Sequence, residues 1–156
     1  MFRGTILLID RFSRMNTLIN SYLSASGFVV ECMRSVDDLR TVRLNTIHLA
    51  LLDIDTAGGR LKEILEQMKS AGVPVIVLTS ESDHAGRLSA LELGAADVMS
   101  RPLDIAELVA RIRAAQARTQ VSVTGFDRPP VSFGGLTVDI SKYRAELDGE
   151  PLNISP

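Results

Sequence analysis

The sequence has almost no cysteine and contains no tryptophan. Its 156 residues include one cysteine, Cys32, and two histidines, His48 and His84. A single cysteine excludes an internal disulfide and is usual for a reducing compartment, so the chain is predicted to be cytoplasmic. The cysteine and the histidines show no spacing typical of a zinc site. Because Cys32 lies in an apolar run, its thiol is predicted to be buried and structural.

The chain also lacks a strong charge of either sign and a long apolar segment. Its formal net charge is −2, which gives this chain no electrostatic reason to bind nucleic acid by itself. The first apolar run, residues 5–9, is too short for a signal peptide or a membrane span. No membrane partner is therefore predicted.

Short apolar runs alternate with segments of helical periodicity over residues 4–118. The runs are Thr5–Ile9, Phe28–Cys32, His48–Leu52, Val75–Leu78 and Val98–Met99. The middle runs lack period-two alternation, as expected of strands that are buried on both faces of a parallel sheet. The intervening segments carry apolar residues at spacings of three and four. The predicted fold class is therefore α/β, a doubly wound five-stranded parallel sheet with helices on both faces.

The pattern changes after Arg118, and three parts of the chain are predicted. Residues 1–119 form the α/β domain, and residues 120–130, with Gly125 among them, form a linker. Residues 131–156 alternate with period two, which indicates a short antiparallel β tail too small to be stable alone.

Two local signals stand out in this tail. Asp148-Gly149 separates two alternating runs and is typical of a tight β-hairpin. Ser155-Pro156 has the N-cap and first-turn residues of a helix. On this signal the sequence is predicted to be a fragment of a longer protein.

Polar residues follow the predicted strands at one edge of the sheet. They are Asp10, Asp53, Thr79 and Arg101. In an open parallel sheet the carboxyl ends of the strands collect the functional groups. Each residue alone could cap a helix or end a strand, but their order favours one shared site.

Four segments around these residues resemble the signature segments of response-regulator receiver domains. They cover residues 6–10, 48–53, 74–80 and 94–102. The resemblance implies the flavodoxin-like (βα)5 receiver fold and a role in signal transduction in place of enzymatic catalysis. It also implies that Asp53 occupies the phospho-acceptor position, Thr79 is the hydroxyl switch residue and Asp10 is one of the usual magnesium ligands. A histidine kinase is the implied phosphoryl donor.

Three positions depart from the pattern of that family. Arg11 replaces the second acidic residue, Arg101 replaces a lysine, and Val98 replaces an aromatic switch residue. Two aspartates facing two arginines leave no net negative charge for a divalent cation. We therefore expect no cofactor, weak or absent Mg²⁺ binding, and an atypical receiver in which Arg11 pairs with Asp10 and Asp53.

Two alternatives remain open at this stage. The first is a conventional phospho-accepting receiver, in which Asp10 and Asp55 hold Mg²⁺ weakly. The second is a haloacid-dehalogenase-like phosphatase, because residues 52–56 resemble its D-x-D-x-T motif. That family also requires a lysine and a downstream acidic pair, whereas Ala96-Asp97 supplies a single acid.

The tail resembles the opening strands of the winged-helix effector domain in OmpR/PhoB-type regulators. This implies a DNA-binding transcriptional regulator whose DNA-contacting part is absent from this chain. It also implies a cis bond before Pro102 and a homodimer through the fourth helix, fifth strand and fifth helix. The expected ion pairs between subunits are Arg87 with Glu107, Glu92 with Arg113, and Asp97 with Arg111.

Overall fold

The computed structural model describes residues 3–124, 131–139 and 144–152. The chain divides into two compact units, residues 1–116 and 117–156.

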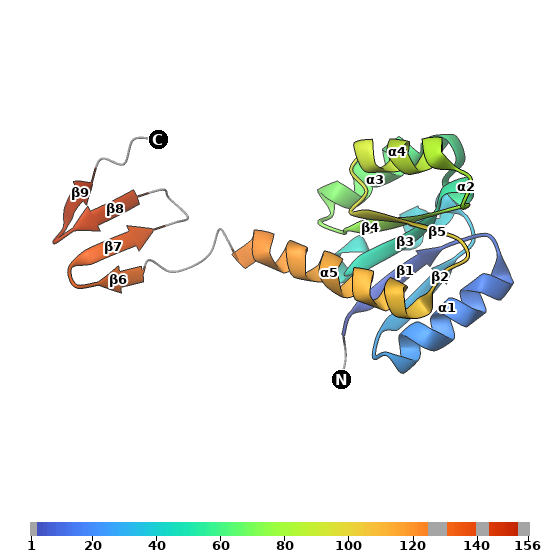
Figure 1. Ribbon diagram of the computed structural model, residues 1–156, viewed down its shortest axis with the longest axis horizontal. Helices are drawn as coiled ribbons and strands as arrows, with labels where there is room; N and C mark the ends of the chain where they lie inside the picture. The colour runs from blue at the N-terminus through green and yellow to red at the C-terminus, as the bar shows by residue number, and fades with distance from the viewer. Residues whose placement is uncertain (1–2, 125–130, 140–143, 153–156) are drawn as a thin grey trace. The chain divides into compact units, whose positions relative to one another are not determined.

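The first unit contains a five-stranded sheet in the order β2-β1-β3-β4-β5 (Figure 1). Its strands are β1 (Thr5–Ile9), β2 (Val29–Met33), β3 (Leu49–Asp53), β4 (Val75–Thr79) and β5 (Asp97–Ser100). All neighbouring strands are parallel. The predicted doubly wound α/β fold is confirmed, with the change in winding direction between β1 and β3.

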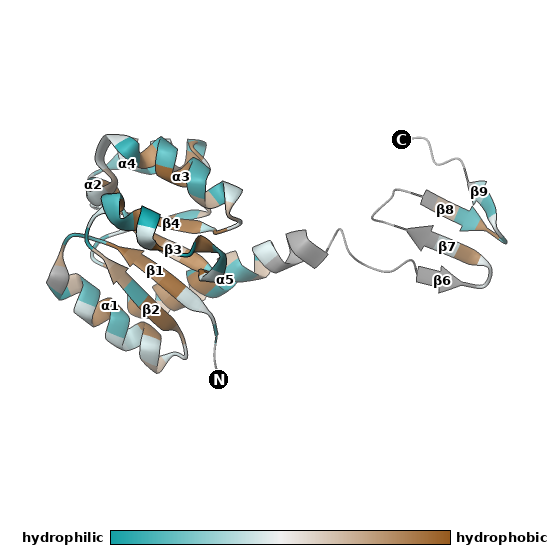
Figure 2. Cartoon of the chain, turned by 180° about the vertical axis from the view of Figure 1, so that it is seen from behind, coloured by the Kyte–Doolittle hydropathy of each residue, from teal (hydrophilic) through white to brown (hydrophobic). Residues whose placement is uncertain are grey.

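Helices cover both faces of this sheet. The main helices are α1 (Ser13–Ala25), α2 (Ile54–Ala57), α3 (Leu61–Ser70), α4 (His84–Glu92) and α5 (Ile105–Thr124). Buried residues of α1 and α5 pack on one face, and those of α2, α3 and α4 pack on the other (Figure 1). The central strands β3 and β4 are buried along their whole length, and the strands of this sheet are largely hydrophobic in Figure 2. This burial explains why their sequences lack alternation.

The connection from β2 to β3 differs from the expected strand–helix alternation. It contains two 3₁₀ helices, η1 (Val36–Thr41) and η2 (Leu44–Thr46), where a regular α-helix is expected. Only Val36 and Leu39 of these helices are buried. Their spacing of three matches the period of a 3₁₀ helix, which places both on one side. A third short 3₁₀ helix, η3 (Gly58–Arg60), precedes α3.

The prediction that Cys32 is buried is wrong. Cys32 is exposed, because β2 is an edge strand of the sheet and Met33 is its only buried residue. An apolar run therefore indicated the strand correctly but not the burial of each of its residues.

The second unit contains an antiparallel sheet in the order β6-β7-β8-β9, which confirms the short β tail. Its strands are β6 (Val131–Phe133), β7 (Leu136–Asp139), β8 (Arg144–Leu147) and β9 (Glu150–Leu152). Leu147 pairs with Glu150 across a two-residue turn, in which Asp148 and Gly149 have φ of 53° and 86°. Two positive φ values are typical of the predicted tight hairpin.

Two predicted boundaries in the second half of the chain need comment. Helix α5 runs to Thr124 and so overlaps the start of the predicted linker at 120–130. The segment contains no glycine or proline before Gly125, so nothing stops the helix earlier. The predicted helix start at Ser155-Pro156 lies outside the described residues.

Among the residues that the structure describes, no helix combines the length and the apolar character that a membrane crossing requires.

Candidate functional site

Polar side chains meet at the carboxyl edge of the parallel sheet. Asp10 follows β1, Asp53 ends β3, Thr79 ends β4 and Arg101 follows β5. Asp10, Asp53 and Thr79 are fully buried. A buried carboxylate requires a charged or hydrogen-bonding partner, because desolvation of an unpaired charge is costly. The partner of both carboxylates is therefore the central question about this site.

Arg101 bridges the two aspartates with a single guanidinium group. Its Nη1 donates to Oδ1 of Asp53 at 2.7 Å, and its Nη2 donates to Oδ2 of Asp10 at 2.9 Å. The Arg101 side chain is 22% exposed, whereas both carboxylates are 0% exposed. The planar fork of arginine allows one side chain to hold two acids in this way. Removal of one member of such a buried ion pair typically costs about 3–5 kcal/mol of stability.

The remaining carboxylate oxygens are also occupied. Oδ1 of Asp10 accepts from the backbone N–H of Phe12 at 2.8 Å. Oδ2 of Asp53 accepts from the backbone N–H of Thr56 at 2.9 Å and from the Thr56 hydroxyl at 2.6 Å. Every carboxylate oxygen of Asp10 and Asp53 therefore accepts at least one hydrogen bond from the protein.

Arg11 does not take the place that the sequence predicts for it. Its guanidinium carbon lies 5.0 Å from the centroid of the Phe12 ring, and the residue is exposed. Only its backbone reaches the site, where the N–H donates to the Thr56 hydroxyl at 3.1 Å. The expected pairing of Arg11 with Asp10 and Asp53 is wrong, because Arg101 already fills the space between both carboxylates.

The peptide bond between Arg101 and Pro102 is cis, as the sequence predicts. The backbone N–H of Arg101 donates to the carbonyl oxygen of Thr79 at 2.8 Å, so the loop after β5 is attached to the end of β4.

The two predicted switch positions stay apart from the bridge. The Thr79 hydroxyl is buried and has no hydrogen-bond partner in the described part of the chain. The same holds for the hydroxyl of Ser100, which lies opposite Thr79 in the neighbouring strand. Val98 is 7% exposed and packs in the hydrophobic core beneath the helices α2, α3 and α4.

Sequence reasoning missed two residues that support the site. Thr56 ties Asp53 to the start of α2, where the Asp53 side chain is the N-cap. Asn16 is 6% exposed, and its side-chain amide donates to the carbonyl oxygen of Asp10 at 2.7 Å. The Asp-x-x-Thr spacing is a recognisable N-cap signal, but it was interpreted as part of a phosphatase motif. Asp55, the presumed acid of that motif, is exposed.

The electrostatics of the site affect Asp10 most clearly. Burial raises the pKa of Asp10 above its ordinary value, and the negative charge of Asp53 raises it further. The hydrogen bond from Phe12 and the charge of Arg101 lower the pKa but do not offset the effect of burial. Asp10 is therefore the carboxylate whose charge depends most on the bridge.

The residues at this edge do not fit a divalent cation. Mg²⁺ requires oxygen ligands in near-octahedral geometry, yet every oxygen of Asp10 and Asp53 already accepts a hydrogen bond. A guanidinium lies between the two carboxylates, and its charge repels a cation. Within the described ranges, no cluster of three or more His, Cys, Asp or Glu residues could hold a metal.

Comparison with known families identifies one match that covers most of the chain. The family model described as "Response regulator receiver domain" matches residues 6–113. These residues include all five strands of the parallel sheet and the bridged aspartates.

Individual relatives give the same result. The chain is 35% identical to the transcriptional regulatory protein GltR of Pseudomonas aeruginosa, over 97% of this chain and 64% of that protein. It is 31% identical to the TorCAD operon transcriptional regulatory protein TorR of Escherichia coli K12, over 96% of this chain and 67% of that protein. This chain thus spans about two thirds of the length of each relative.

A solved structure extends the likeness of fold to both units of the chain. The response regulator DrrB, a Thermotoga maritima OmpR/PhoB homolog, has a TM-score of 0.63 and 21% sequence identity. The similarity covers 99% of this chain and 68% of that chain.

The raised pKa of Asp10 predicts a pH dependence of stability. The folded protein binds a proton at Asp10 more tightly than the unfolded chain, whose carboxyl has the ordinary pKa of 3.8. The stability contributed by this group is therefore present at low pH and is lost as the pH rises through the raised pKa. Titration of the Asp10 carboxyl carbon by NMR should give a pKa above 3.8.

The variant Asp53→Asn serves as the comparison for this titration. It removes the like charge beside Asp10 and should lower the Asp10 pKa. An Asp10 pKa at or below 3.8 in the unsubstituted protein would contradict this account of the site.

Proposed function

The chain belongs to the family of response regulator receiver domains, and we propose that it is the receiver of a DNA-binding transcriptional regulator that works without phosphorylation of Asp53. The homology to OmpR/PhoB-type regulators supports the assignment to transcription. DNA would be contacted by an effector domain that this chain lacks, and the working compartment would be the cytoplasm. The observation that carries the proposal is the Arg101 bridge between Asp10 and Asp53.

The bridge opposes phosphoryl transfer in two ways. The nucleophile would be a carboxylate oxygen of Asp53, but one oxygen pairs with Arg101 and the other accepts two hydrogen bonds from Thr56. Both interactions withdraw electron density from the attacking atom. Phosphoryl transfer also depends on cations that neutralise the developing charge, and the site does not fit a divalent metal.

The usual response to phosphorylation also lacks its parts. Val98 has no aromatic ring that could swing inward, and the Thr79 hydroxyl makes no contact with the bridge. We therefore infer that the domain stays in one state, which the Arg101 bridge holds. Its regulation would come from its abundance or from a ligand other than a phosphoryl group.

Intact mass measurement after incubation with acetyl phosphate and magnesium tests the proposal. The unsubstituted chain should gain no phosphoryl group. The double variant Arg11→Asp with Arg101→Lys replaces the bridging fork by a point charge and adds a carboxylate. It should bind Mg²⁺ and accept one phosphoryl group, and adding Asp53→Asn to this variant should abolish the gain.

The control pairs Arg14→Asp with Arg101→Lys, because Arg14 is exposed on α1 and should not supply a metal ligand. A phosphoryl group on the unsubstituted chain that Asp53→Asn removes would show that the conventional receiver is correct. Turnover of p-nitrophenyl phosphate would instead favour the phosphatase alternative.

Dimerisation through α4, β5 and α5 is the proposed output of the domain. Two leucines of α4, Leu88 and Leu91, are 59% and 51% exposed, which gives this face an apolar centre. The charged residues Arg87, Glu92 and Arg113 are exposed and make no ion pair within the part of the chain that is described.

Arg111 is paired within its own chain in this structure. It contacts Asp97 at 2.7 Å and Glu107 at 2.9 Å, whereas the sequence analysis places its contact with Asp97 between subunits. An exchange of these partners between two chains would replace one exposed ion pair by another, which contributes only about 0.2–1 kcal/mol. The leucines, more than the ion pairs, are therefore expected to stabilise the dimer.

Sedimentation velocity tests this assignment. The chain should be a dimer well above micromolar concentration, and Leu88→Glu with Leu91→Glu should make it monomeric, because charges would enter an apolar contact. Leu18→Glu on α1, where the leucine is 49% exposed, should leave the dimer intact. A monomer at every concentration would rule out the proposed output.

A further inference from the structure

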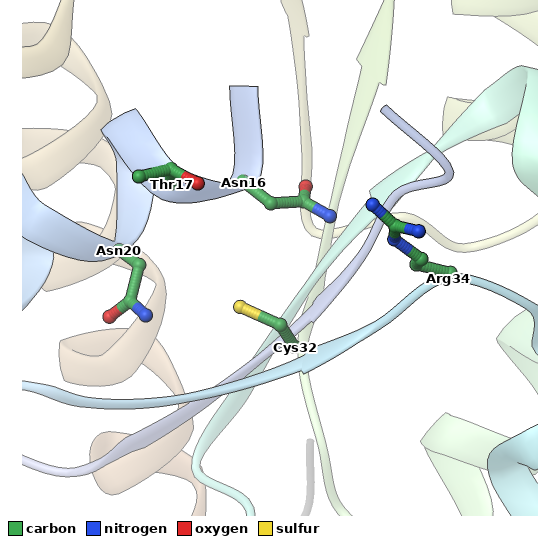
Figure 3. A pocket seen from close by; sticks show the side chains of 5 residues that line it. All are labelled: Asn16, Thr17, Asn20, Cys32 and Arg34. Atoms are coloured by element: carbon green, nitrogen blue, oxygen red, sulfur yellow. The ribbon is translucent and has the colours of Figure 1, made fainter. Parts of the chain in front are cut away.

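A polar cavity lies between α1 and the edge strand β2 (Figure 3). Its volume is about 310 Å³, and its lining residues are Asn16, Thr17, Asn20, Cys32 and Arg34. The first three belong to α1, Cys32 belongs to β2, and Arg34 follows β2 at the carboxyl edge of the sheet. This volume is at the lower end of the range for small-molecule sites.

Arg34 supplies an uncommitted positive charge to this cavity. Its residue is exposed, and it forms no ion pair within the described ranges, unlike Arg60, Arg101 and Arg111. An arginine fork is well suited to a carboxylate or a phosphate. In Figure 3 the guanidinium of Arg34 and the amide of Asn16 point toward the same end of the cavity.

Asn16 supplies a buried acceptor without a donor. Its amide nitrogen donates to the carbonyl oxygen of Asp10, which fixes the orientation of the amide group. Its Oδ1 is then left without a hydrogen-bond partner in the described part of the chain, although the residue is only 6% exposed. An unsatisfied buried acceptor is unfavourable, and a donor group of a ligand would satisfy it.

Asn20 and Cys32 supply donors. Oδ1 of Asn20 accepts from the Ser24 hydroxyl at 2.9 Å, which leaves the amide nitrogen of Asn20 as its donor. Cys32 is exposed as a residue, yet partial burial of its thiol raises the thiol pKa. The thiol therefore stays protonated at neutral pH and is a weak donor that points into the cavity (Figure 3).

We propose that this cavity binds a small organic anion that carries a hydroxyl group. Arg34 binds the phosphate or carboxylate of this ligand, Asn20 donates to the same anionic group, and Asn16 Oδ1 accepts from the ligand hydroxyl. One cation, one amide donor and one buried acceptor match a single molecule with an anionic end and a hydroxyl end.

The cavity is connected to the Arg101 bridge through Asn16. The amide of Asn16 holds the carbonyl oxygen of Asp10, and the side chain of Asp10 accepts from Arg101. A ligand that fixes Asn16 therefore acts on the loop that positions Asp10. The regulatory role of this site rests on the proposed function, whereas binding of the ligand does not.

NMR titration of the full ¹⁵N-labelled chain tests the site, with sn-glycerol 3-phosphate and D-glycerate as probes. Both probes carry a hydroxyl group, and the tighter of the two identifies the preferred anionic group. The side-chain amide signals of Asn16 and Asn20 should shift in a saturable manner. Arg34→Ala should weaken binding at least about tenfold, because it removes a charged hydrogen bond.

The matched control is Arg40→Ala, which removes an exposed arginine of η1 and should leave the dissociation constant unchanged. The assignment is overturned if neither probe gives a saturable shift, or if Arg34→Ala binds as tightly as the unsubstituted chain. Inorganic phosphate that binds as tightly as sn-glycerol 3-phosphate would overturn recognition of the hydroxyl group.

The coupling to the bridge has a separate readout. Guanidinium signals of Arg101 should move when the probe saturates the cavity, and signals that stay fixed would overturn the coupling. Phosphorylation of Asp53 in the mass measurement would refute the proposed function but would not alter the binding result. The two failures are therefore distinguishable.

Discussion

The structure depends on one buried contact, in which Arg101 pairs with both Asp10 and Asp53. Two carboxylates without exposed surface would repel each other and resist burial if no cation lay between them. Arg101 supplies that cation from the loop after the edge strand β5. The bridge thus joins the ends of β1, β3 and β5, and it sets the protonation of Asp10 as well as the availability of Asp53.

The hydrophobic sheet creates the conditions for this contact. Apolar residues of β1 and β3 are buried on both faces, so the first polar side chains at the strand ends lie partly within the core. In a phospho-accepting receiver such a place suits a metal ion. Here the fixed charge of an arginine replaces an exchangeable cation, and the hydrogen bonds from Phe12 and Thr56 use the oxygens that remain.

The strands and the identity of the site residues could be predicted from the sequence, because apolar runs and the convergence of strand ends are local signals. The partner of the aspartates could not, because Arg11 is adjacent to Asp10 in the chain and Arg101 is distant. Only side-chain direction decides between them, and Arg11 turns to Phe12. The exposure of Cys32 depends on strand order, which its own apolar segment does not encode.

The most direct measurement of the bridge is the ¹⁵N NMR spectrum of the Arg101 guanidinium at low temperature. A guanidinium held by two carboxylates rotates slowly about its Nε–Cζ bond, so Nη1 and Nη2 should give separate signals. These signals should vanish as a pair in Arg101→Lys and should stay in place when magnesium and acetyl phosphate are added. One averaged Arg101 signal, or signals that move with magnesium, would contradict a closed site.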